Sequence, residues 1–102
     1  MFEPDDFARL ERITLADFEP LRGEAFESVG VGELRLVVVE RLDPQIAEAE
    51  REPFRLVFEG PSSTRCEQGL HDLRHLTLGR LPLFLVPLGE TAGRLRLEAV
   101  IQ

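Results

Sequence analysis

The chain of 102 residues has no tryptophan, no tyrosine and no lysine, and it has one cysteine. Without lysine, it can form no lysine Schiff base and lacks the lysine of a phosphate-binding P-loop. Because Cys66 has no second cysteine to pair with, no disulfide can form within the chain, which fits a reducing compartment. The seven phenylalanines are the only aromatic residues, so a core must be built from Leu, Val and Phe.

Charge and hydrophobicity restrict the classes of partner. The formal net charge is −7 and no run of basic residues occurs, so we expect neither nucleic acid nor an anionic membrane as a partner. The N-terminus has no positive charge and no apolar segment, which is unlike a secretory signal. No apolar run approaches the ~18 residues of a membrane span. The chain is therefore predicted to be cytoplasmic.

The spacing of apolar residues predicts the fold. A spacing of three predicts a short helix over residues 4–13, and a second helical turn starts at Thr14 and is closed by Pro20 and Gly23. After Gly23 the spacing becomes two, which is typical of strands. The predicted strands are 25–29, 33–41, 53–60, 69–78, 83–88 and 94–102. Residues 42–51 interrupt the pattern and can form a turn or one short helix.

This pattern predicts one all-β domain over residues 1–102, with six antiparallel strands in a small barrel or sandwich. The helical turns of residues 1–22 would pack on the sheet of residues 23–102. In the second strand, alternation places Leu34, Leu36 and Val38 on one face. In the 69–78 strand, either the face with His71 and His75 or the opposite face could point inward.

The run Leu83, Phe84, Leu85 and Val86 lies between Pro82 and Pro87, and it would make a strand apolar on both faces. One face must meet the core. The other must lie under the N-terminal helical turns or against another molecule. The alternation does not decide whether Phe84 or Leu85 points inward.

No motif for catalysis or metal binding stands out. His71 and His75 have the H-x-x-x-H spacing of a zinc pair, but on a strand they would lie ~13 Å apart. Ser62, Ser63, His71 and Asp72 contain the letters of a serine-hydrolase triad without its G-x-S-x-G elbow. We therefore predict no catalytic residue, no metal and no cofactor. The candidate interaction surface comprises Leu83, Phe84, Leu85, Val86, His71 and His75.

Four blocks of sequence carry a family resemblance. They read FEPLRGEAF over residues 18–26, EPFRLVFEGP over 52–61, QGLHDLRH over 68–75 and LFLVPLG over 83–89. In this order they resemble a family of short, uncharacterised bacterial single-domain proteins, over residues 15–102. The resemblance implies no known activity and no catalytic residues. It also implies an assembly role, since some relatives lie among phage-tail-like genes.

Two hypotheses for function follow. In the first, the domain is a non-catalytic structural or protein-interaction module that binds a protein partner or itself through the 83–88 strand. In the second, it is a β-barrel that binds a small ligand in an interior with space among Phe26, Phe54, Phe58 and Phe84.

Overall fold

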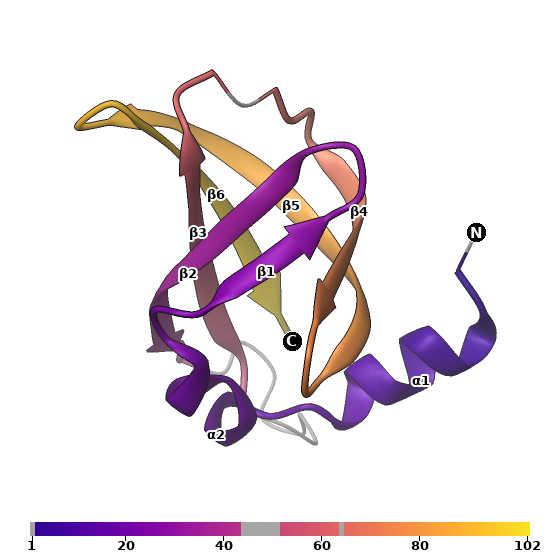
Figure 1. Cartoon of the computed structure of the whole chain (residues 1–102). Helices are drawn as coiled ribbons and strands as arrows, with labels where there is room; N and C mark the ends of the chain where they lie inside the picture. The colour runs from indigo at the N-terminus through magenta and orange to yellow at the C-terminus, as the bar shows by residue number, and fades with distance from the viewer. Residues whose placement is uncertain (1, 44–51, 64) are drawn as a thin grey trace.

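The computed structural model describes residues 2–43, 52–63 and 65–102, which form a closed antiparallel barrel (Figure 1). In chain order the elements are α1 (Pro4–Arg12), α2 (Leu15–Phe18), the 3₁₀ turn η1 (Glu19–Leu21), β1 (Ala25–Ser28), β2 (Gly32–Arg41), β3 (Phe54–Pro61), β4 (Gly69–His75), β5 (Gly79–Thr91) and β6 (Arg94–Ile101). Around the barrel the strands follow the order β1-β2-β3-β6-β5-β4. The six-stranded all-β prediction is confirmed, and closure selects the barrel over the sandwich.

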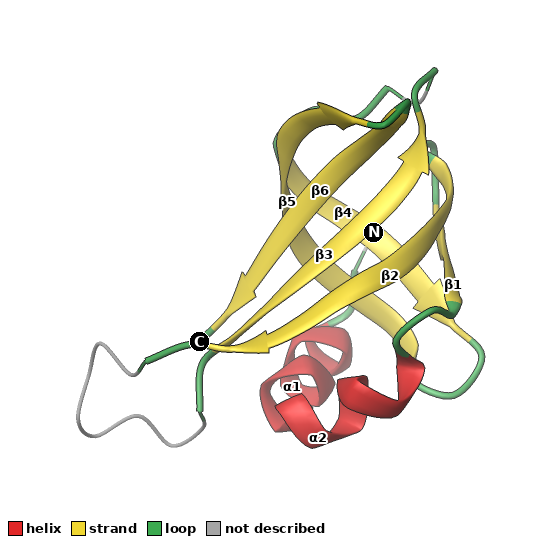
Figure 2. Cartoon of the chain, turned by 90° about the vertical axis from the view of Figure 1, so that its left-hand side faces the viewer, coloured by secondary structure: helices red, strands yellow, loops and turns green. Residues whose placement is uncertain are grey.

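The short helices begin where the sequence carries capping residues. The backbone N–H of Glu3 donates to the carboxylate of Asp6 over 2.9 Å, and that of Thr14 donates to Asp17 over 2.8 Å. Each pair forms a capping box, which satisfies donors that a helix start leaves free. The helices lie at one end of the barrel (Figure 2). There the fully buried Phe18 ring lies 5.6 Å from the ring of Phe54, so α2 closes that end.

The barrel interior is filled with apolar side chains. The rings of Phe26 and Phe58 meet edge to face with centroids 5.3 Å apart, and both are fully buried. Phe54, Leu56 and Phe58 alternate inward along β3, as predicted. Interdigitated rings of this kind account for a large part of the area that a small core buries.

The inward face of β2 differs from the prediction after its midpoint. Leu34 and Leu36 are fully buried, but the pairing with β3 shifts between Leu36 and Val38. A bulge of this kind adds one residue and reverses the alternation beyond it. Val39 is therefore buried and Val38 only half-buried, so the prediction that Val38 shares a face with Leu34 and Leu36 is wrong.

The junction between β4 and β5 also differs from the prediction. The fourth strand ends at His75 rather than at residue 78, because the backbone N–H groups of Thr77 and Leu78 donate to Nδ1 of His75 and form a turn. Gly79 begins β5 with a φ of 77°, a left-handed conformation that glycine adopts readily. The next strand then runs 13 residues, with Pro87 at a bulge. The helix or turn predicted over residues 42–51 lies almost entirely outside the described residues.

Candidate interaction surface

The strand β5 separates the apolar run of residues 83–86 into two faces. Leu83 and Leu85 are fully buried in the core, whereas Phe84 points outward with 52% of its surface exposed. Val86 shares the outward side and is half-buried. The question that the alternation left open is thus answered: Leu85 points inward and Phe84 does not.

Leu70 and Phe84 are opposite each other on the outside of the barrel. They are paired residues of β4 and β5, and Leu70 is 50% exposed. On the other side of β5, Val86 is opposite Glu98, and the next outward residue of β6 is Val100, 45% exposed. We call Leu70, Phe84, Val86 and Val100 the outer apolar strip. It crosses three neighbouring strands, so one flat partner surface could cover it.

Charged residues border the strip on the β6 side. Arg55 of β3 forms an ion pair with Glu98 of β6, and the backbone of Arg55 pairs with that of Val100. Val57 lies between Arg55 and Glu59 on the outward side of β3. Its side chain is nevertheless only 1% exposed. An apolar centre with a charged border is the usual composition of a protein–protein interface.

The helix α1 lies beside the first part of β5 (Figure 1). The guanidinium of Arg80 lies 4.7 Å from the ring centre of Phe2 and makes ion pairs of 3.7 Å with Asp6 and 2.9 Å with Asp72. The next outward residue, Pro82, is buried. The outward side of β5 is therefore covered near the helix and open at Phe84.

These ion pairs change the acidity of the groups involved. Burial alone would raise the pKa of Asp72, but hydrogen bonds from Arg80 and Arg74 outweigh it and lower the pKa below its ordinary value. The hydrogen bond that Arg80 donates to Asp72 raises the pKa of Arg80. A backbone hydrogen bond from Glu3, aided by Arg9, lowers the pKa of Asp6. The carboxylates are thus held in their charged form.

His75 is a core residue of the closed end of the barrel. It is 8% exposed, and its ring lies 4.6 Å from that of Phe26. Since Nδ1 accepts the two turn N–H groups, Nε2 carries the hydrogen and donates to Oε1 of Glu24 over 2.8 Å. Both ring nitrogens are occupied. Three residues of the predicted surface, Leu83, Leu85 and His75, are therefore not accessible to a partner.

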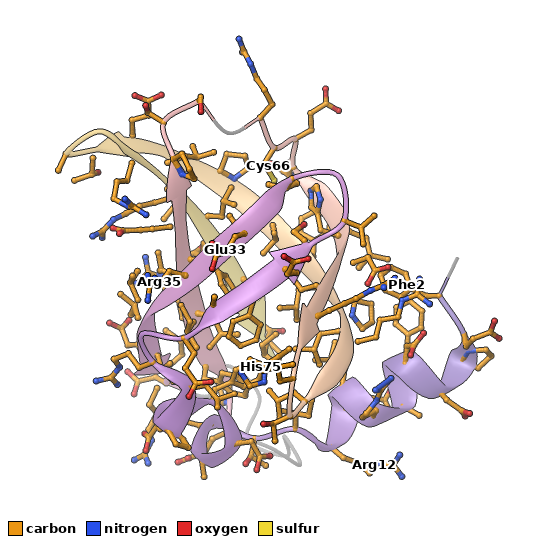
Figure 3. The ribbon with its side chains drawn as sticks, in the orientation of Figure 1. Phe2, Arg12, Glu33, Arg35, Cys66 and His75 are labelled. Carbon is orange, nitrogen blue, oxygen red and sulfur yellow. The ribbon has the colours of Figure 1, made fainter. Side chains whose placement is uncertain are left out.

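His71 lies toward the other end of the barrel, beside Cys66, as the positions of Cys66 and His75 in Figure 3 indicate. Nε2 of His71 is 3.4 Å from the Cys66 sulfur and 2.7 Å from the carbonyl oxygen of Glu67. A carbonyl only accepts, so Nε2 must carry the hydrogen and cannot take a proton from the thiol. Burial also raises the pKa of the Cys66 thiol. This geometry does not activate a nucleophile.

The two histidines of β4, His71 and His75, are separated by the geometry of the strand. In the part of the chain that the structure describes, no three His, Cys, Asp or Glu side chains gather in an arrangement that could hold a metal ion. No helix within the same residues is long and apolar enough to cross a membrane.

Leu70 and Val100 were not among the predicted surface residues. The alternation alone places Val100 outward, so a scan for outward apolar residues could have found it. Leu70 is different, because its relation to Phe84 depends on the register between β4 and β5. That register follows from the turn capped by His75 rather than from the alternation in either strand.

A family model described as "Domain of unknown function (DUF6916)" matches residues 13–101, which excludes α1 and includes the whole barrel. No curated protein and no solved structure matched the chain.

Proposed function

The chain belongs to the family of domains of unknown function DUF6916, and from that premise we propose that it is a non-catalytic protein-interaction module. The proposal rests on one observation, the pairing of two half-exposed apolar side chains, Leu70 and Phe84, on the outer face of the barrel. The partner covers the outer apolar strip, and Phe84 is its anchor.

The size of the strip indicates the kind of contact. A fully buried aromatic side chain removes roughly 150–250 Å² from water, so covering the 52% of Phe84 that is exposed would remove about 100 Å². At ~25 cal/mol per Å² this corresponds to roughly 2–3 kcal/mol. Such an anchor suits the centre of an interface that also recruits the charged residues around it. The strip alone is smaller than the ~800 Å² per partner of a stable complex, so flanking residues must contribute.

The chemistry of the polar residues supports a binding role over a catalytic one. Both nitrogens of His75 are occupied by hydrogen bonds, and the hydrogen on Nε2 of His71 points to a carbonyl rather than serving the thiol. The acids that carry lowered pKa values, Asp6 and Asp72, are engaged by arginines around α1. None of these groups resembles a poised acid or base.

The alternative of an interior ligand site has less support. Of the four phenylalanines expected around the cavity, Phe84 lies outside the barrel, and Phe26, Phe54 and Phe58 are fully buried. Phe18 of α2 adds a further ring between Phe26 and Phe54. A ligand would have to displace these packed rings, which is costly in a close-packed core.

We further propose that the module acts in the cytoplasm, where its single thiol stays reduced, as a part of a larger assembly such as a phage-tail-like particle. An assembly component needs a repeated contact of modest strength, which a half-exposed apolar strip can supply. The partner can be another protein of the assembly or a second copy of this chain.

The experiment compares two substitutions that each remove one exposed apolar side chain. Phe84→Ser alters the strip, and Leu76→Ser is the control, because Leu76 is fully exposed on the β4–β5 turn. Affinity capture from the source cells, with mass spectrometry of the captured proteins, is run beside sedimentation velocity of each purified variant. We expect Phe84→Ser to lose the partner or the self-association that the parent and Leu76→Ser retain.

Two outcomes would contradict the proposal. In one, Phe84→Ser captures the same proteins and sediments in the same way as the parent. In the other, the parent is monomeric at the highest concentration reached and captures no protein that Phe84→Ser fails to capture. Far-UV circular dichroism of both variants checks that the barrel is intact.

A further inference from the structure

A groove of about 520 Å³ lies on the barrel away from the outer apolar strip. Its walls come from the β1–β2 turn at Gly30 and Gly32, the beginning of β2, the end of β3 with the following loop, and the beginning of β6. Its volume lies within the roughly 300–1,000 Å³ of typical ligand sites, and its walls combine charged side chains with a similar share of apolar surface. The sequence contains no motif that predicts this groove.

Arginines dominate the charged residues of the groove. Arg35, Arg65 and Arg94 line it together with Glu33 and Glu59. Glu59 is already paired twice, since its Oε1 lies 3.4 Å from Nε of Arg94 and its Oε2 lies 2.9 Å from a terminal nitrogen of Arg96. One carboxylate thus neutralises only one of the two arginines that bind it.

The other two arginines of the groove have no acidic partner among the described residues. Arg35 donates one hydrogen bond to the carbonyl oxygen of Gly23, a neutral acceptor, which leaves the remaining guanidinium donors open. Arg65 makes no ion pair to any described residue and is exposed. Glu33 is the acid that opposes them; it and Arg35 both project from β2 (Figure 3). The groove therefore carries an excess of positive charge in a chain whose net charge is −7.

We propose that this groove binds side-chain carboxylates of an acidic peptide segment. A guanidinium matches a carboxylate with two parallel hydrogen bonds, and each open arginine can bind one such group. A phosphate dianion is less suited, because the carboxylate of Glu33, which also lines the groove, would repel its second negative charge. A peptide with several carboxylates can pair with both Arg35 and Arg65, whereas a small acid with a single carboxylate can pair with only one of them.

The site is independent of the outer apolar strip. The strip lies on β4, β5 and β6, and the groove is formed by the β1–β2 turn, β3 and the beginning of β6. The Phe84→Ser variant should therefore bind an acidic peptide as the parent does. That variant distinguishes a failure of this inference from a failure of the proposed function.

The probe is an acetylated and amidated tetraglutamate peptide, titrated into ¹⁵N-labelled protein and followed by NMR, with capped tetraglutamine as the uncharged comparison. We expect shifts at Arg35, Arg65 and the β1–β2 turn with tetraglutamate only, and weaker binding at high salt. Arg65→Gln removes a charge-assisted hydrogen bond and should weaken binding by roughly tenfold. Glu33→Gln removes an opposing charge and should strengthen binding by about threefold.

Arg12→Gln is the matched control, because Arg12 is an exposed arginine on α1, remote from the groove (Figure 3). It should leave the affinity nearly unchanged. The inference is overturned if tetraglutamate causes no shifts at millimolar concentration, or if Arg65→Gln and Arg12→Gln weaken binding equally. Tighter binding of inorganic phosphate than of tetraglutamate at the same arginines would also overturn it, since it would assign the groove to phosphate.

Discussion

Replacing each of two adjacent residues of β5 by alanine tests which way the strand faces. Leu85 is fully buried and Phe84 is half-exposed, so the substitution of Leu85 should cost more. Truncating a buried leucine removes its transfer free energy and leaves a cavity, which together cost about 3 kcal/mol or more. For Phe84→Ala only the buried half of the side chain is lost, roughly 100 Å² at ~25 cal/mol per Å², which corresponds to about 2 kcal/mol of unfolding free energy and leaves no enclosed cavity.

The measurement must suit the composition of the chain. With no tryptophan and no tyrosine, intrinsic fluorescence is a poor probe, and far-UV circular dichroism of the barrel is the better one. Unfolding in urea then gives the free energy of unfolding for the parent and for each variant. Thermal unfolding should show a melting temperature about 12–24 °C lower for Leu85→Ala, if each kcal/mol shifts it by 4–8 °C in a domain of this size.

The ratio of the two costs is the informative quantity. If Phe84→Ala costs as much as Leu85→Ala, or more, then the register of β5 is shifted by one residue and the outward face assigned to Phe84 is wrong. The outer apolar strip would then be part of the core. A Leu83→Ala variant should behave like Leu85→Ala, because both side chains are fully buried on the same face.

Two further predictions concern the turn after β5 and the ion pairs beside α1. Ala92 has a φ of 53°, a left-handed conformation that disfavours a side chain, so Ala92→Gly should raise the unfolding free energy by ~0.5–1 kcal/mol in the same urea assay. Asp72→Asn should lower stability at neutral pH by at most ~1 kcal/mol, because solvent screens these ion pairs. Since the pKa of folded Asp72 is lowered, its contribution is complete above the ordinary value of 3.8 and is lost as the pH falls through the folded pKa. The difference between parent and Asp72→Asn should therefore shrink below pH 3.8; a difference that does not change from neutral pH to pH 2 would contradict this account.

Local patterns determined much of the fold. The spacing-two alternation identified the strands of the barrel other than β5, which the apolar run of residues 83–86 identified, and Thr14 marked the start of α2. Along β3 the inward set of Phe54, Leu56 and Phe58 followed from alternation alone. These features depend on neighbours within a few residues, so the sequence carries them directly.

Pairing between distant strands decided the rest. The phase of β2 reverses at a bulge opposite β3, which makes Val39 rather than Val38 a core residue. Whether the strands close into a barrel depends on the short pairing of β1 with β4, where Glu27 meets Arg74. Neither the bulge nor the closure leaves a mark in a single strand, because each arises from how two strands align.

The candidate site illustrates the same division. The sequence of residues 83–86 predicted a strand that is apolar on both faces. The face away from the core was therefore expected to lie under the N-terminal helical turns or against another molecule. Only the tertiary structure decided that Leu85 enters the core and that Leu70 comes to lie beside Phe84. It also decided that His75 is buried, with its Nδ1 accepting hydrogen bonds from backbone N–H groups of the following turn. Alternation has a period of two but no absolute phase. The phase is set by the register of the neighbouring strands, which is a property of the folded barrel.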